Sequence, residues 1–179
     1  MLGLSAGLSA DLRAWGAEYP PDDARTATRR GYELATRLAA ELGPSWVVLC
    51  HDVVRGVENC VCWACGGFHW RRDAHEPLVG SRTVRLKLEF QCYPLRFVGG
   101  EHDGVNFAPD DPVVALGLTD ELVDRLYAWA KGLDEAIDSR HDLTATERQQ
   151  SAAQGRLLFQ QLTEELDPRW AVEYDALDD

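Results

Sequence analysis

The sequence lacks any apolar run approaching the roughly 20 residues of a membrane-spanning helix, and residues 1–4 lack the basic segment of a secretory signal. We therefore expect a cytoplasmic protein with no membrane partner. Lysine is also scarce, since only Lys87 and Lys131 accompany the 16 arginines among 18 basic residues. The 30 acidic residues bring the net charge to −12, which argues against a general affinity for nucleic acid or anionic lipid.

The common catalytic motifs are also missing. The sequence contains no phosphate-binding loop, no dinucleotide-binding glycine fingerprint and no His-Glu-x-x-His helix. A nucleophile pair such as Cys50 with His102 can be drawn, but no local signature of a nucleophile elbow supports it. The sequence therefore predicts a protein that is not an enzyme and that needs no cofactor.

The five cysteines are an odd number in a chain without an export signal, and this argues against a disulfide framework. Three of them cluster: Cys60, Cys62 and Cys65. Cys62-x-x-Cys65-Gly66 resembles one knuckle of a zinc ribbon, but Cys50 with His51, or Cys92, would have to replace the missing second pair. The cluster is therefore either a zinc-binding module or a set of core residues and reduced thiols. Gly66 and Gly67 contradict a thioredoxin-like dithiol, which would open a helix.

Two parts of the chain resemble each other. Residues 3–15 align with 117–129 at an offset of 114, and residues 31–48 align with 155–172 at an offset of 124. Each copy predicts a helix, a loop, a second helix and a strand, with apolar residues at helical spacing. Trp15 and Trp129 occupy equivalent positions, and we expect both to be anchors of the core.

Local signals define the ends of these elements. Ser5 and Thr119 stand at helix N-cap positions, and residues 144–147 form a capping-box pattern. Prolines precede predicted strands at 46–50 and 170–174, and apolar and charged residues alternate over 84–90 as in a half-buried strand. Gly31 and Gly155 recur at equivalent helical positions, where we expect a close contact that a side chain would obstruct.

Together these signals predict an α+β protein with a single domain over 1–179. Two helix-helix-strand repeats would pack on a small antiparallel sheet. The repeats cover residues 3–50 and 117–175, and a cysteine-rich insert covers 51–98.

The second repeat has a family resemblance. Its motifs are Leu126-x-x-Trp129, Gly155-x-x-Leu158 and Leu162-x-x-Glu165-Leu166-x-Pro168. This pattern resembles small bacterial proteins of the toxin-immunity type over residues 84–175, with a degenerate copy at 3–50. The resemblance implies a protein that neutralises a secreted toxin by binding it.

The acidic residues are concentrated in the C-terminal half, where residues 99–179 carry nineteen acidic and six basic side chains. Asp124, Glu135 and Asp138 fall on the helix side opposite the apolar stripe, and we predict that they bind a basic toxin. Two alternatives stay open: the charge serves solubility alone, or the chain is an oligomeric scaffold.

Overall fold

The computed structural model describes residues 3–18, 20–69, 82–100, 102–140 and 142–176. The chain divides into two compact units, Met1–Pro77 and Leu78–Asp179. Each unit combines helices with a small sheet, which confirms the α+β class. The boundary lies inside the expected insert over 51–98, and the single-domain organisation stays a prediction. In the described part of the chain, no helix is both long and apolar enough to cross a membrane.

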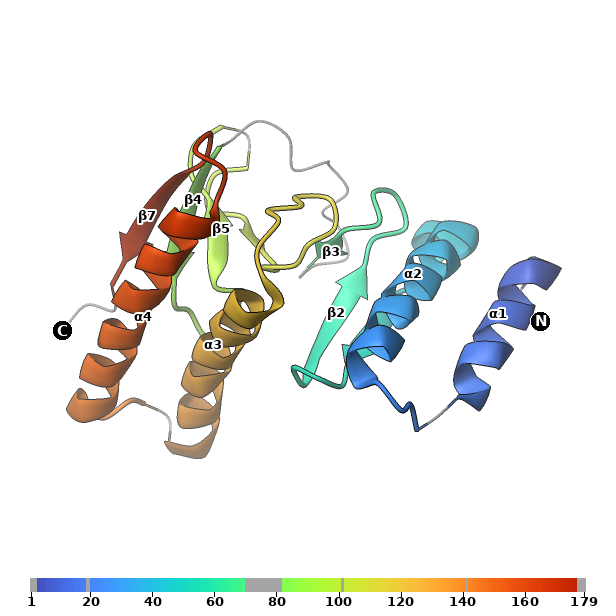
Figure 1. Cartoon of the computed structure of the whole chain (residues 1–179), viewed down its shortest axis with the longest axis horizontal. Helices are drawn as coiled ribbons and strands as arrows, with labels where there is room; N and C mark the ends of the chain where they lie inside the picture. The colour runs from blue at the N-terminus through green and yellow to red at the C-terminus, as the bar shows by residue number, and fades with distance from the viewer. Residues whose placement is uncertain (1–2, 19, 70–81, 101, 141, 177–179) are drawn as a thin grey trace. The chain divides into compact units, whose positions relative to one another are not determined.

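The first unit contains two helices, a short 3-10 helix and three strands. These are α1 (Ala6–Ala17), α2 (Ala24–Leu42), η1 (Gly43–Ser45), β1 (Val48–Asp52), β2 (Val57–Val61) and β3 (Phe68–His69). The strands form an antiparallel sheet in the order β1-β2-β3. Helix α2 packs against β1 and β2, and α1 packs against α2 (Figure 1).

Local capping explains where the two helices of this unit begin and end. The Ser5 hydroxyl accepts a hydrogen bond from the Leu8 N–H, as expected for an N-cap. Asp23 caps α2 by accepting from the Arg25 N–H. Helix α2 ends at Leu42, and its C-cap residue, Gly43, has a positive φ of 66°, which suits a residue without a side chain.

The second unit contains two longer helices and four strands. These are β4 (Thr83–Lys87), β5 (Leu95–Phe97), β6 (Asn106–Phe107), α3 (Asp120–Arg140), α4 (Ala145–Glu165) and β7 (Ala171–Asp175). Helices α3 and α4 lie side by side, and α4 packs against β7 (Figure 1). The predicted capping box is confirmed, because the Thr144 hydroxyl accepts from the Glu147 N–H and the Glu147 carboxylate accepts from the Thr144 N–H.

The expected single antiparallel sheet is wrong in two respects. The strands form two sheets, and the second, in the order β6-β5-β4-β7, is mixed. Strand β7 pairs parallel to β4, with Val172 opposite Val84. A parallel neighbour is possible here because a long connection that includes α3 and α4 joins the two strands, whereas a tight hairpin would impose the antiparallel direction.

The core of the second unit lies between its sheet and helices α3 and α4. Leu126, Leu158 and Leu162 are fully buried there. Trp129 is only 3% exposed, which confirms it as a core anchor. Trp15, its counterpart in the first unit, is 36% exposed, so the same expectation is wrong for this residue.

Candidate functional site

The three acidic residues predicted to bind a partner all lie on α3. With about 3.6 residues per turn, positions 124, 135 and 138 fall on one side of this helix, and we call these three residues the acidic side of α3. Glu135 and Asp138 are exposed and within one turn of each other, whereas Asp124 is half-buried and about 16 Å away along the axis. The structure therefore brings two of the three residues close together.

Two other carboxylates of the second unit, Asp142 and Asp167, make local hydrogen bonds and ion pairs. Asp142 accepts from the Leu143 N–H and pairs with Arg148, and both contacts lower the pKa of its carboxyl. Asp167 binds the side chain and the backbone N–H of Arg169, which lowers its pKa to about 2. Both carboxylates therefore already have partners close by in the sequence.

Glu135 and Asp138 differ from these carboxylates in their contacts. Glu135 meets Lys131 only at 3.7 Å, with 69% of the Glu135 side chain exposed. Asp138 has no hydrogen bond or ion pair within the described residues, and its charge helps raise the pKa of Asp134. The larger cause of that rise is the burial of Asp134, whereas the hydrogen bond that Asp134 accepts from the Gln91 N–H at 2.7 Å lowers the same pKa. Glu135 and Asp138 are thus open to a cation from outside.

A hollow of about 350 Å³ lies beside Glu135, between α3 and α4. Its α3 wall includes Ala128, Gly132 and Ala136, whose small side chains leave the space open. Its α4 wall is polar and includes Glu147, Gln150 and Gln154. This hollow is not among the sequence predictions. The small residues at a spacing of four on α3 lie on one side of the helix and could have indicated it.

The two units make the same hydrogen bonds at positions that the sequence alignment pairs. The Trp15 indole N–H donates to the Ala27 carbonyl at 3.1 Å, and the Trp129 indole N–H donates to the Ser151 carbonyl at 3.0 Å. The Ser5 hydroxyl donates to Glu41 at 2.6 Å, and the Thr119 hydroxyl donates to Glu165 at 2.9 Å. In each hydrogen bond, the donor residues of the two units are 114 positions apart in the sequence and the acceptor residues are 124 positions apart. These are the two offsets of the sequence alignment.

The expected close contacts at the two recurring glycines are confirmed. A Cβ at Gly31 would lie 3.1 Å from Trp15 Cζ2, and one at Gly155 would lie 2.8 Å from Trp129 Cζ2. Each glycine therefore provides the space in which the tryptophan ring of the preceding helix packs.

The cysteine cluster forms a tight turn after β2. The Ala64 N–H points at Cys62 Sγ and the Gly67 N–H at Cys65 Sγ, each at 3.4 Å. Gly66 permits the turn with a φ of 76°. Cys50 and Cys62 are buried, and burial together with the charge of Asp52 raises the pKa of the Cys50 thiol to about 11.

The described residues do not form a complete site for a metal ion. Among the residues that the structure describes, no group of three His, Cys, Asp or Glu side chains could hold a metal ion. Cys50 belongs to the first unit and His102 to the second.

The comparisons with known proteins concern the second unit. No curated protein matches the sequence. A family described as Serratia CdiI immunity protein-like matches residues 82–176, which are more than half of the chain. The matched stretch runs from the residue before β4 to the residue after β7, and it includes both long helices and the acidic side of α3. The chain therefore belongs to the Serratia CdiI immunity protein-like family.

Proposed function

We propose that this protein is a non-catalytic, cytoplasmic immunity protein that neutralises a bacterial toxin by binding it. Membership of an immunity protein-like family is the observation that carries the proposal. The partner is a basic protein toxin, and the acidic side of α3 covers its functional surface. The proposal involves no nucleic acid, membrane or cofactor.

The distribution of charge supports the second unit as the binding unit. Residues 78–179 carry twenty acidic and ten basic side chains, whereas residues 1–77 carry ten and eight. Glu135 and Asp138 are exposed on α3. Unlike Asp142, which binds Arg148, and Asp167, which binds Arg169, they accept no local hydrogen bond among the described residues. A basic side chain of the toxin that enters the hollow beside Glu135 would meet a carboxylate on each wall, from Glu135 and from Glu147.

The test is a titration of this protein with the protein encoded by the neighbouring gene, which we expect to be the toxin. We expect nanomolar binding that weakens between about 0.05 and about 0.5 M salt, because salt screens exposed charges. Changing Asp124, Glu135 and Asp138 together to lysine should weaken binding at least tenfold.

A matched variant controls for net charge. Glu33, Glu58 and Glu164 are exposed carboxylates on elements other than α3, with no ion pair among the described residues. Changing these three to lysine alters the net charge equally and should leave the affinity within about threefold. Equal loss in both variants, or binding that salt does not affect, contradicts the acidic side of α3 as the binding surface.

We also propose that α1-α2-β1 and α3-α4-β7 are two copies of one helix-helix-strand repeat within a single domain. The equivalent tryptophan, glycine and carboxylate contacts support this proposal. The edge strands of the two copies differ, since β1 pairs antiparallel and β7 pairs parallel with their neighbours. Expression of residues 78–179 alone tests the arrangement, because a soluble, cooperatively folded fragment would contradict a single folding domain.

A zinc-binding module is the second candidate function, and the turn at Cys62–Gly67 favours it. Backbone N–H groups that point at both sulfurs would stabilise thiolates bound to a cation. Cys60 and His69 lie nearby in paired strands, and His75 lies outside the described residues. Mass spectrometry of the purified protein decides the question: a structural site requires about one zinc per chain, and less than about 0.1 contradicts it.

A further inference from the structure

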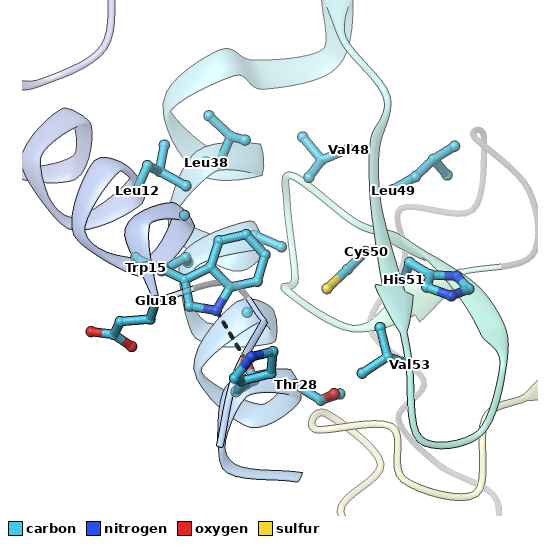
Figure 2. Close-up of a pocket in the computed structure, with 16 residues that line it drawn as sticks. Leu12, Trp15, Glu18, Thr28, Leu38, Val48, Leu49, Cys50, His51 and Val53 are labelled. Carbon is cyan, nitrogen blue, oxygen red and sulfur yellow. Dashed lines mark hydrogen bonds between the residues drawn. The ribbon is translucent and has the colours of Figure 1, made fainter. Parts of the chain in front are cut away.

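The first unit contains a cavity of about 390 Å³ between α1, α2 and β1 (Figure 2). Its walls are mainly apolar and include Leu12, Trp15, Leu38 and Val48. The Cys50 sulfur points into this space, on the side facing the Trp15 ring (Figure 2). The cavity lies entirely within the described residues of the first unit and is large enough for an aromatic ring, since apolar cavities of about 150 Å³ already take up benzene.

The second unit explains why this space is open. In that unit the rings of Phe159 and Tyr174 stack against each other, with centroids 6.1 Å apart and an interplanar angle of 27°. The equivalent residues of the first unit, at the offset of 124, are Ala35 and Cys50. The small side chains of these two residues leave the volume that two aromatic rings fill in the second unit.

The exposure of the two tryptophans reflects this difference. Trp129 is 3% exposed and lies close to Tyr174, since both would touch a Cβ at Gly155. Trp15 is 36% exposed, although its indole N–H makes the equivalent hydrogen bond, to Ala27 (Figure 2). The first unit therefore has the tryptophan of the aromatic cluster but lacks the phenol ring that packs beside it.

A polar group stands where that phenol would end. The Tyr174 hydroxyl donates to the Ala152 carbonyl at 3.0 Å. The residue equivalent to Ala152 is Thr28, which lines the cavity and is 7% exposed. The Thr28 hydroxyl is buried and has no hydrogen-bond partner within the described residues. A buried hydroxyl normally has one, so this position suits a ligand with a hydroxyl group.

The sulfur that faces the cavity is also uncharged at neutral pH. Burial raises the pKa of the Cys50 thiol to about 11, with a further contribution from Asp52, so the thiol stays protonated at neutral pH. The lining includes no lysine or arginine; its other ionisable residues are Glu18, which pairs with Arg30, and His51, which follows Cys50 on β1 and so points to the other face of that strand. A neutral ring is therefore favoured over a carboxylate or phosphate.

We propose that this cavity binds a neutral phenol, with its ring in the place that Tyr174 has in the second unit and its hydroxyl at Thr28. The proposal rests on the equivalence of the two repeats proposed above. The ligand class is a small para-substituted phenol, which has two sources: a free metabolite, or a tyrosine side chain presented by a protein.

The first test is calorimetric titration of the full chain with p-cresol and with toluene, which lacks the hydroxyl. We expect one p-cresol per chain with a dissociation constant of about 0.1 to 1 mM, and binding of toluene at least fivefold weaker. The Thr28 and Cys50 amide resonances should shift in the nuclear magnetic resonance spectrum. Absence of binding up to the solubility limit of p-cresol, or shifts confined to other residues, overturns the proposal.

Two variants test the location. Cys50→Tyr supplies the missing ring from the chain itself and should weaken p-cresol binding at least tenfold, with circular dichroism as the check on folding. Ala35→Phe fills the same space from α2 and replaces Cys50→Tyr if that variant does not fold. Unchanged affinity in a folded filled variant overturns the site.

Two further measurements separate the remaining questions. Tyr174→Cys should open an equivalent cavity in the second unit and raise the stoichiometry from one to two. If binding at Thr28 persists but the stoichiometry stays at one, the phenol site stands and the equivalence of the repeats fails.

N-acetyl-tyrosinamide that binds as tightly as p-cresol supports a protein tyrosine as the occupant, and binding of p-cresol alone supports a free phenol. No toxin enters these measurements, so failure of the toxin-binding proposal is a separate result.

Discussion

The Glu165 carboxylate at the end of α4 accepts hydrogen bonds from both the backbone N–H and the hydroxyl of Thr119, at the start of α3. The same hydroxyl accepts from the Leu122 N–H, so one threonine caps α3 and also ties it to α4. These contacts hold the two ends of the antiparallel helix pair together, 46 residues apart in the sequence.

Removing the charge of Glu165 should therefore loosen the helix pair. We expect Glu165→Gln to lower the free energy of unfolding by about 1 kcal/mol, because it weakens charge-assisted hydrogen bonds at an exposed site. The adjacent Glu164 is exposed and makes no ion pair among the described residues, so Glu164→Gln is the matched control and should change stability by less than about 0.5 kcal/mol. Urea unfolding followed by circular dichroism measures both, and equal effects would contradict a special role for Glu165.

The corresponding contact in the first unit predicts a pH dependence. The Ser5 hydroxyl and N–H lower the pKa of Glu41 from its ordinary value of 4.5. Because the folded state lowers this pKa, the contribution is fully present above pH 4.5 and is lost as the pH falls through the lower, folded value. Urea unfolding between pH 6 and pH 3, with roughly half-unit steps, should show a smaller acid-induced loss for Glu41→Gln than for the unmodified protein. Parallel pH curves for the two proteins would refute this.

The two recurring glycines should respond differently to the same substitution. A Cβ at Gly155 would lie 2.8 Å from Trp129 Cζ2 and 2.9 Å from Tyr174 Cε2, and the Trp129 side chain is only 3% exposed. We expect Gly155→Ala to lower the free energy of unfolding by about 1 to 3 kcal/mol, since overpacking exceeds the gain in helix propensity. At Gly31 the contact to Trp15 is 3.1 Å and that ring is 36% exposed, so Gly31→Ala should change stability by no more than about 1 kcal/mol. Destabilisation at Gly31 equal to that at Gly155 would contradict the difference in packing.

Local signals in the sequence predict much of this fold. The capping box at Thr144 and the cap at Ser5 depend on residues three positions apart, and both are confirmed. The pairing of β7 with β4 depends instead on where a strand far along the chain docks, and alternation within 84–90 carries no information about that direction.

The candidate sites likewise differ in whether they depend on local spacing or on the packing of distant elements. That Glu135 and Asp138 share one side of a helix follows from their spacing. The cavity beside Trp15 depends on the absence of rings at Ala35 and Cys50, which matters only once α2 and β1 are packed together. Comparison of Cys50 with Tyr174 across the two copies is the signal that could have revealed it.

Rates of association provide the last prediction. Exposed charges act mainly on the encounter between proteins, because their field reaches beyond the contact surface and salt screens it over about 10 Å at 0.1 M. Glu135→Lys should therefore slow association with the toxin by about three- to tenfold at low salt and change dissociation by less than about threefold. The control is Glu164→Lys, an equal change of charge on α4. Stopped-flow fluorescence of the six tryptophans measures both rates. If Glu135→Lys instead accelerates dissociation and leaves association unchanged, Glu135 makes a buried contact with the toxin, and the hollow beside it is the place to look for the partner side chain.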